Sequence, residues 1–292
     1  MTNKCEPQQT PLVSVIIPVF NRADTIGTTL DSVKAQIYRP IEVLVVDDGS
    51  ADESVQVIQE WITNNKSQNL SVLLIQQENK GAPAARNQGL VRASGSYLQF
   101  LDSDDTLEPE KIRAQVGVLE ASDADVAICD FKYDYNDPVK DRVVANNGDL
   151  LKKLVAGWSI YTSSPLISTK LINDKIKWNE RLERNQDIDF IFKVMMLAGK
   201  YVYTPGVWCN YVQHNGAQIS DTYKLKAPQY GRRILSLIYF SISCSNHLSK
   251  GRKLMVAIGI INLLKQKVRY RTKVLLRAVF GEALVRWIKK FA

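Results

Sequence analysis

The sequence of 292 residues predicts an α/β protein whose mostly parallel β-sheet carries helices on both faces. From Leu12 to about Asp130, short β-branched runs alternate with helix-forming stretches, a spacing typical of parallel strands joined by helices. Two of the apolar runs end directly in clusters of aspartate. Because ligands of open α/β sheets lie beyond the carboxyl ends of the strands, this pattern also indicates where a site is expected.

The strands and helices can be assigned in order from the hydrophobic pattern. Short apolar runs predict strands at 13–17, which Pro18 ends, and at 41–46, 71–76, 97–101 and 126–129. Between them, helices are expected at 23–36, around 55–62, at 81–93 and at 109–121. The first helix places Ile26, Leu30 and Val33 on one face, and Pro83 is tolerated in the first turn of the third.

The rest of the chain has a different pattern. Residues 133–218 are less regular and rich in Trp and Tyr, which we interpret as core and pocket-wall side chains. One helix is expected at 187–198, with Gly199 as its stop. After Pro228 the sequence predicts helices only, whose apolar runs are shorter than the ~20 residues that a membrane-spanning helix needs.

Composition excludes several protein classes. With 45% hydrophobic and 23% charged residues, the chain is globular rather than disordered. Its four cysteines form no CxxC pair, which argues against a disulfide framework or a structural zinc site. The first ten residues lack the apolar stretch of a secretory signal, so we expect a cytoplasmic protein.

The charge is divided unevenly along the chain. Residues 224–292 hold 16 of the 38 Lys and Arg residues and one of the 30 acidic ones, a net charge of +15, which leaves −7 for residues 1–223. We therefore expect an acidic body over 1–223 and a basic amphipathic helical extension over 224–292. The extension is expected to dock on an anionic membrane surface; packing on the body or a dimer contact are the alternatives. No recognition motif accompanies the charge, so nucleic acid is not an expected partner.

Two strand ends carry the acidic clusters. Asp102, Asp104 and Asp105 follow the 97–101 run, and Asp47 and Asp48 follow the 41–46 run. Like charges this close repel and raise one another's pKa, so a cation is expected among them. Mg²⁺ and Mn²⁺ take oxygen ligands and combine one or two carboxylates with substrate phosphates. The alternative is a polar strand end in which Asp105 or Thr106 caps the next helix.

Four motifs in a fixed order identify a family. They are VIIPVFN at 15–21, VVDDGS at 45–50, NKG at 79–81 with ARNQG at 85–89, and FLDSDD at 100–105. The combination resembles family 2 glycosyltransferases of the GT-A fold over about residues 12–220. The resemblance implies an inverting transferase with a Rossmann-like, mostly parallel sheet. It implies that 1–223 is the catalytic domain, with a nucleotide-binding half at about 12–130 and an acceptor half at about 131–223.

The resemblance also assigns a nucleotide site. Pro18, Phe20 and Asn21 are expected to line a slot for the base, with the Phe20 ring stacked on it. Asp48 matches a position that accepts a hydrogen bond from a pyrimidine N–H. Arg86 can reach the base or a phosphate with its planar cation, the alternative being an ordinary surface ion pair.

The metal ligands follow from the same motifs. Asp102 and Asp104 match the DxD pair that holds a divalent ion, Mn²⁺ or Mg²⁺, against the nucleotide diphosphate. Asp102 is also expected to contact the nucleotide. Asp105 either joins them or acts from behind. His214 fits a position near the metal or diphosphate, although a lone histidine is equally often structural.

Asp187 is the expected catalytic base. It matches the acidic position before an aromatic-rich helix, but Gln186 stands where the family usually has Glu, so Asp189 remains the alternative. Asp187 can also simply cap its helix.

These residues lead to one expected function and two rivals. We expect a sugar to pass from a nucleotide-sugar donor, with uridine as the base, to a glycan or lipid-linked acceptor, in bacterial surface polysaccharide or glycolipid assembly on the cytoplasmic face of the membrane. A metal-dependent nucleotidyltransferase is one rival, but residues 18–22 are not the Gly-rich basic loop that it needs. A non-enzymatic membrane-binding module is the other, and it leaves Asp48, Arg86 and Asp102 unexplained.

Overall fold

The computed structural model describes residues 10–135, 137–150, 160–172, 176–182 and 186–212. The chain divides into two compact units, of which the first contains all the strands and the second contains helix α6 (Gln186–Leu197). Within the described ranges, no helix is both long and apolar enough to cross a bilayer. The expected domain boundary at 223/224, the basic extension and His214 lie outside the described residues.

The first unit combines one sheet with four helices. The strands are β1 (Val13–Val19), β2 (Ile41–Asp47), β3 (Leu70–Gln76), β4 (Tyr97–Phe100), β5 (Thr106–Leu107), β6 (Val126–Asp134), β7 (Arg142–Val144), β8 (Leu166–Ser168) and β9 (Tyr201–Val212). The helices are α1 (Ile26–Lys34), α2 (Ser54–Asn64), α3 (Ala82–Arg92) and α4 (Lys111–Ser122), with a 3₁₀ turn at Thr169–Leu171.

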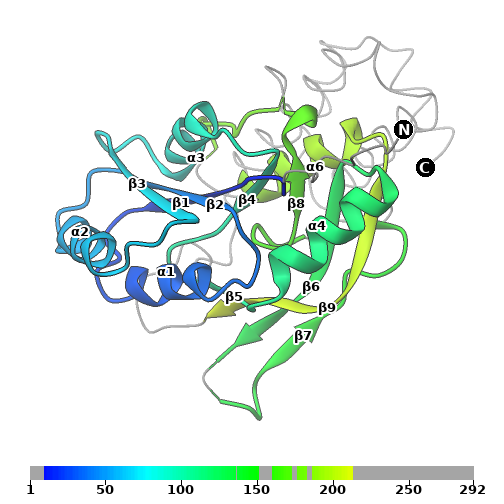
Figure 1. Cartoon of the computed structure of the whole chain (residues 1–292), viewed down its shortest axis with the longest axis horizontal. Helices are drawn as coiled ribbons and strands as arrows, with labels where there is room; N and C mark the ends of the chain where they lie inside the picture. Colours follow the sequence, from blue (N-terminus) through cyan, green and yellow to red (C-terminus); the bar gives the residue numbers. More distant parts are fainter. Residues whose placement is uncertain (1–9, 136, 151–159, 173–175, 183–185, 213–292) are drawn as a thin grey trace, which may run out of the picture. The chain divides into compact units, whose positions relative to one another are not determined.

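Strands β1 to β4 form the parallel half of the sheet, in the order β3-β2-β1-β4. β3, at the end of this order, leaves side chains such as Leu73 exposed. The other three strands are buried on both faces: Val15 and Val45 lie in the large core with α1 and α2, whereas Val46 packs with Ala85 of α3. Figure 1 shows α3 on one side of these strands and α1 on the other. Burial on both faces explains why these strands appear in the sequence as continuous apolar runs.

Helix α3 packs against β1 at a distance that only glycine allows. A Cβ atom built at Gly89 would lie 2.5 Å from Cγ2 of Ile16, closer than non-bonded carbon atoms approach. This contact fixes the height of α3 on the sheet. It therefore also fixes the position of Arg86, one turn earlier on the same helix.

The second half of the sheet is mixed. β8 runs antiparallel to both of its neighbours, β4 and β6, so β6 runs in the same direction as β4. β9 is parallel to β6, while β5 pairs with β9 and β7 with β6 in antiparallel fashion. The order is β3-β2-β1-β4-β8-β6-β9-β5, with β7 beside β6. The carboxyl ends of β1, β2, β3, β4 and β6 therefore share one edge of the sheet, the edge at which ligands are expected.

The prediction that Pro18 ends the first strand is wrong, because β1 continues through it to Val19. The carbonyl of Ile16 accepts a hydrogen bond from the amide of Leu101, on the β4 side of β1. The backbone nitrogen of residue 18, two positions further along the strand, points to the same side of β1. On that side β4 has already ended at Phe100. The absent N–H of proline therefore breaks no ladder hydrogen bond.

The other predicted elements of the first 130 residues are confirmed within a few residues, but the middle of the chain is more regular than its sequence indicates. β6 extends to Asp134 instead of Cys129, and β5, β7, β8 and β9 have no predicted counterpart. β5, β7 and β8 are only two or three residues long, too short to give an apolar pattern. The helix expected at 187–198 is confirmed as α6.

Candidate functional site

The loop after β4 places its three carboxylates in two environments. The side chains of Asp102 and Asp104 are 26% and 18% exposed, whereas Asp105 is 1% exposed. The amide of Asp105 donates to the carbonyl of Asp102 at 3.2 Å and closes the turn that contains them. The strand end thus presents two of the three carboxylates at the sheet edge.

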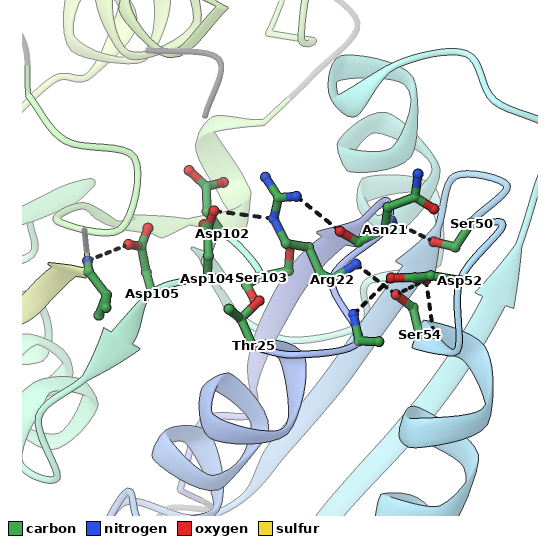
Figure 2. A network of polar contacts seen from close by, with 12 residues as sticks. Asn21, Arg22, Thr25, Ser50, Asp52, Ser54, Asp102, Ser103, Asp104 and Asp105 are labelled. Carbon is green, nitrogen blue, oxygen red and sulfur yellow. Dashed lines mark hydrogen bonds and ion pairs between the residues drawn. The ribbon is translucent and has the colours of Figure 1, made fainter. Parts of the chain in front are cut away.

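Asp105 supports this loop from behind. Its Oδ2 accepts a hydrogen bond from the Tyr161 hydroxyl, and its Oδ1 accepts one from the Val212 amide at 3.1 Å. Figure 2 shows its carboxyl apart from the other polar contacts of the loop. Burial, and then the charges of Asp104 and Asp102, raise the pKa of Asp105 well above its usual value.

Each of the two exposed carboxylates is paired with an arginine. Nη2 of Arg86, on α3, lies 2.6 Å from Oδ1 of Asp102, and Nε of Arg22, in the loop after β1, lies 3.3 Å from Oδ2 of Asp104. We call these four residues the edge cluster. Sequence reasoning identified Arg86 and missed Arg22, although Arg22 directly follows Asn21 in the first motif.

Arg86 contacts the ring of Trp178 in addition to its ion pair with Asp102. The guanidinium carbon of Arg86 lies 4.3 Å from the centroid of the Trp178 ring, which meets Phe100 edge to face at 5.1 Å. The side chain of Asn87 binds both the amide and the carbonyl of Trp178, each at 2.9 Å. A planar guanidinium suits this combination of ring face and carboxylate better than an ammonium group does. Trp178 was expected only as one of the core or pocket-wall aromatics of residues 133–218, and its contact with Arg86 exists only in the fold.

Asp48 anchors the loop that leads into α3. Its Oδ1 accepts from the Lys80 amide at 2.8 Å and from the Gln77 side chain at 2.7 Å, and its Oδ2 accepts from the Gly81 amide at 2.7 Å. Gly81 adopts a φ of 89°, a conformation that favours glycine. A carboxylate has about four acceptor sites, so these three contacts leave room for about one more.

The loop after β1 separates the three residues predicted to line the base slot. Pro18 is buried inside β1, whereas Phe20 is 44% exposed and presents its ring to solvent. Oδ1 of Asn21 accepts from the Ala51 amide at 2.9 Å, and the Asn21 amide donates to Oγ of Ser50 at 3.0 Å. Asn21 therefore joins the loops that follow β1 and β2, and of the three only Phe20 offers an open ring face.

The donor set suits a hard divalent ion shared with a ligand. Among the residues that the structure describes, no group of three or more His, Cys, Asp or Glu side chains is placed to hold a metal. Asp102 and Asp104 supply two carboxylates, and an ion such as Mg²⁺ completes its shell with phosphate oxygens and water. The residues therefore fit an ion that binds together with a diphosphate.

The second unit contains the two candidate bases. Asp187 lies in the first turn of α6, and its side chain is half-buried. Asp189 is fully buried, and its Oδ2 lies 2.6 Å from Nζ of Lys193. The ion pair with Lys193 and the complete burial of Asp189 both argue against Asp189 as the general base.

Comparison with known proteins gives a consistent family. The family model for "Glycosyl transferase family 2" matches residues 14–182. The chain is 26% identical over 223 residues to the amylovoran biosynthesis glycosyltransferase AmsB of Erwinia amylovora, covering 70% of this chain and 73% of AmsB. It is 37% identical over 125 residues to glycosyltransferase GlyA of Streptococcus pneumoniae, covering 43% of this chain but only 17% of GlyA.

Two solved structures share the fold. S. aureus TarS (residues 1–349) in complex with UDP-GlcNAc matches with a TM-score of 0.70 and 22% identity, covering 89% of this chain and 77% of TarS 1–349. Mannosyltransferase PcManGT of Pyrobaculum calidifontis, in complex with GDP-Man and Mn²⁺, matches with a TM-score of 0.60 and 17% identity, covering 97% of this chain and 85% of PcManGT.

Proposed function

The chain belongs to glycosyl transferase family 2 and has the GT-A fold, and on that premise we propose that it transfers a sugar from a nucleotide-diphosphate donor to an acceptor hydroxyl, with inversion at the anomeric carbon. The observation that carries the proposal is the edge cluster, in which two carboxylates are each paired with an arginine at the carboxyl edge of the sheet. Guanidinium groups match phosphate oxygens, and paired carboxylates match a divalent ion that binds with a diphosphate.

In this proposal the first unit binds the donor. Asp102 and Asp104 hold Mn²⁺ or Mg²⁺, which supplies positive charge beside the leaving diphosphate. Arg86 contacts the nucleotide with the orientation that Trp178 and Asp102 impose on it. The exposed ring of Phe20 stacks on the base, and the acceptor site left on Asp48 receives a pyrimidine N–H, which favours uridine.

Asp187 is proposed as the general base. It removes the proton of the acceptor hydroxyl as that oxygen attacks the anomeric carbon, and the proton stays on the carboxyl while the nucleoside diphosphate leaves. One displacement at carbon inverts its configuration. Asp187 lies in the first turn of α6, the end of a helix at which the helix dipole favours a negative charge.

The test is donor turnover across a panel of UDP-, GDP-, dTDP- and CDP-sugars with Mn²⁺, followed by chromatography of the released nucleotide. We expect the nucleoside diphosphate as product, with a UDP-sugar as the best donor. Release of pyrophosphate would instead identify a nucleotidyltransferase. No turnover of any donor, with intact protein and added glycan acceptors, would reject the proposal.

The base has its own test. Asp187→Asn keeps the shape of the side chain and removes its basicity, so we expect donor affinity to stay unchanged and kcat to fall at least ~10²-fold. Asp189→Asn is the matched variant and is expected to lose stability rather than catalysis, because it breaks the ion pair with Lys193. If only Asp189→Asn lowered kcat, the two roles would be exchanged.

We also propose that the acceptor is carried by a lipid at the cytoplasmic face of a membrane. The support is the net charge of +15 over residues 224–292, which attracts an anionic surface. The full chain is expected to sediment with anionic vesicles at low salt, but not with neutral vesicles or at high salt. Equal sedimentation with both lipids would reject this part of the proposal.

A further inference from the structure

The main chain at Arg22 is fixed by the neighbouring loop. Its amide donates to Oγ of Ser54 at 2.7 Å, and the next amide, that of Ala23, donates to Oδ2 of Asp52 at 3.1 Å. Asp52 also accepts from Ser54, so the loops after β1 and β2 form one hydrogen-bonded unit (Figure 2). Arg22 therefore reaches Asp104 from an anchored backbone.

A second contact ties the same segment to the acidic loop. Oγ1 of Thr25 donates to the carbonyl of Ser103 at 2.9 Å, directly beside Asp104. The Arg22 guanidinium bridges its own loop and the acidic one, because Nη1 donates to the carbonyl of Asn21 at 3.0 Å while Nε faces Asp104. The side chains of Arg22 and Asp104 are 24% and 18% exposed, so both are accessible to a ligand.

Asp104 then has two competing partners. A carboxylate oxygen that binds a guanidinium is less available to a divalent ion, and a half-exposed ion pair of this kind weakens metal binding by about two- to fivefold. A diphosphate changes the balance, because it offers Arg22 a more strongly charged acceptor within the same site. Transfer of Arg22 to the diphosphate removes one competitor of the ion for the Asp104 carboxylate.

From this geometry we infer that Arg22 couples donor binding to metal binding: it pairs with Asp104 in the absence of ligand and transfers to the donor diphosphate when the ion binds Asp104. The inference rests on the proposed function and adds a positioning residue to it. Coupling of this kind is reciprocal, so nucleotide raises metal affinity by the same factor by which metal raises nucleotide affinity.

The first experiment measures binding by isothermal titration calorimetry, with Mn²⁺ and UDP as probes. For Arg22→Gln we expect Mn²⁺ alone to bind about two- to fivefold more tightly than to the wild type, and UDP in the presence of Mn²⁺ to bind about tenfold more weakly. The factor by which Mn²⁺ improves UDP affinity should therefore shrink. An unchanged factor would overturn the inference.

The second experiment removes the metal and uses Asp104→Asn, measured with UDP in EDTA. Release of Arg22 from the carboxylate should strengthen UDP binding about threefold over the wild type. Removing a negative charge near the phosphates would also strengthen binding, so the double variant R22Q/D104N decides between the two causes. We expect it to lose the gain; if it kept the gain, repulsion rather than Arg22 would be responsible and the inference would fail.

Arg113 provides the matched control. It forms an exposed pair with Glu110 at 4.0 Å on α4, so Arg113→Gln removes the same group and should change neither affinity. Arg22→Lys keeps the charge without the planar fork and should fall between Gln and the wild type. If the wild type bound neither UDP nor GDP with Mn²⁺, the proposed donor itself would be wrong; if it bound UDP and Arg22→Gln behaved like Arg113→Gln, only the role of Arg22 would be wrong.

Discussion

Two polar clusters of the first unit differ in their exposure to solvent. The edge cluster is partly open to solvent at the carboxyl edge of the sheet. The buried cluster, Gln99, Lys111 and Gln115, is fully covered between β4, α4 and β6. Nζ of Lys111 donates to the side-chain carbonyls of both glutamines, and the Gln115 amide donates to the carbonyls of Ala127 and Ser164.

This difference in exposure indicates that the polar groups of the buried cluster stabilise the fold, whereas those of the edge cluster can bind a ligand. In the buried cluster the polar groups pair with one another and with the backbone, which leaves nothing for a ligand and holds strands together. In the edge cluster, charges that are strong and partly exposed can exchange partners at low cost. Mutations in the two clusters should therefore affect different measurements.

The largest expected effect is on activity, at the edge cluster. Asp104→Ala should lower donor turnover at least ~10²-fold, because it removes one of the two carboxylates proposed to hold the metal. The free energy of unfolding should change by less than about 1 kcal/mol, since the lost ion pair is partly exposed. Donor turnover in the presence of Mn²⁺ measures the first effect, and urea unfolding curves measure the second. Turnover close to that of the wild type would show that Asp104 is not part of the site.

Next in size is a stability loss in the buried cluster. Lys111→Met keeps the length of the side chain but leaves the side-chain carbonyls of Gln99 and Gln115 without this donor. We therefore expect the free energy of unfolding to fall by about 2–3 kcal/mol. Lys140, exposed and paired with Asp137, provides the control, and Lys140→Met should change stability by less than about 0.5 kcal/mol. Equal effects of the two variants would contradict the distinction drawn between the clusters.

Asp48 combines features of both clusters, because it is only 2% exposed, like the buried cluster, and lies at the carboxyl edge of the sheet, like the edge cluster. Asp48→Asn turns an N–H group toward the amides of Lys80 or Gly81 and should cost about 2 kcal/mol of stability in urea melts. It should also weaken UDP binding. A variant that lost UDP affinity at full stability would make Asp48 a pure binding residue.

The smallest effect is a dependence of stability on pH. Burial lowers the pKa of Lys111 below its usual value. Between that lowered pKa and the unfolded value near 10.4, the folded state binds fewer protons than the unfolded chain, so the free energy of unfolding rises with pH by at most about 1.4 kcal/mol per pH unit. The difference between the wild type and Lys111→Met across this window should show the slope, and a difference that stayed constant with pH would argue against it.

Much of the parallel half of the sheet could be predicted from the sequence, because a strand that is buried on both faces appears as a continuous apolar run. The acidic strand ends were visible because they directly follow such runs, and Arg86 was visible because it lies in the ARNQG motif. β8 and β9 were not predicted, since β8 has only three residues and β9 is half-buried over most of its length. Arg22 and Trp178 were missed because their roles exist only through contacts with Asp104 and Arg86, which are distant in the chain.

The balance of charge in the edge cluster also affects how fast a ligand arrives. Asp102 and Asp104 alone would present two negative charges to an approaching nucleotide sugar and slow its association. With Arg22 and Arg86 beside them the four side chains sum to zero, so little repulsion extends beyond the ~8 Å screening distance of physiological salt. The on-rate of the donor should consequently vary little with ionic strength, and the ligand-free protein can keep two carboxylates at its entrance without repelling the anion that it has to capture.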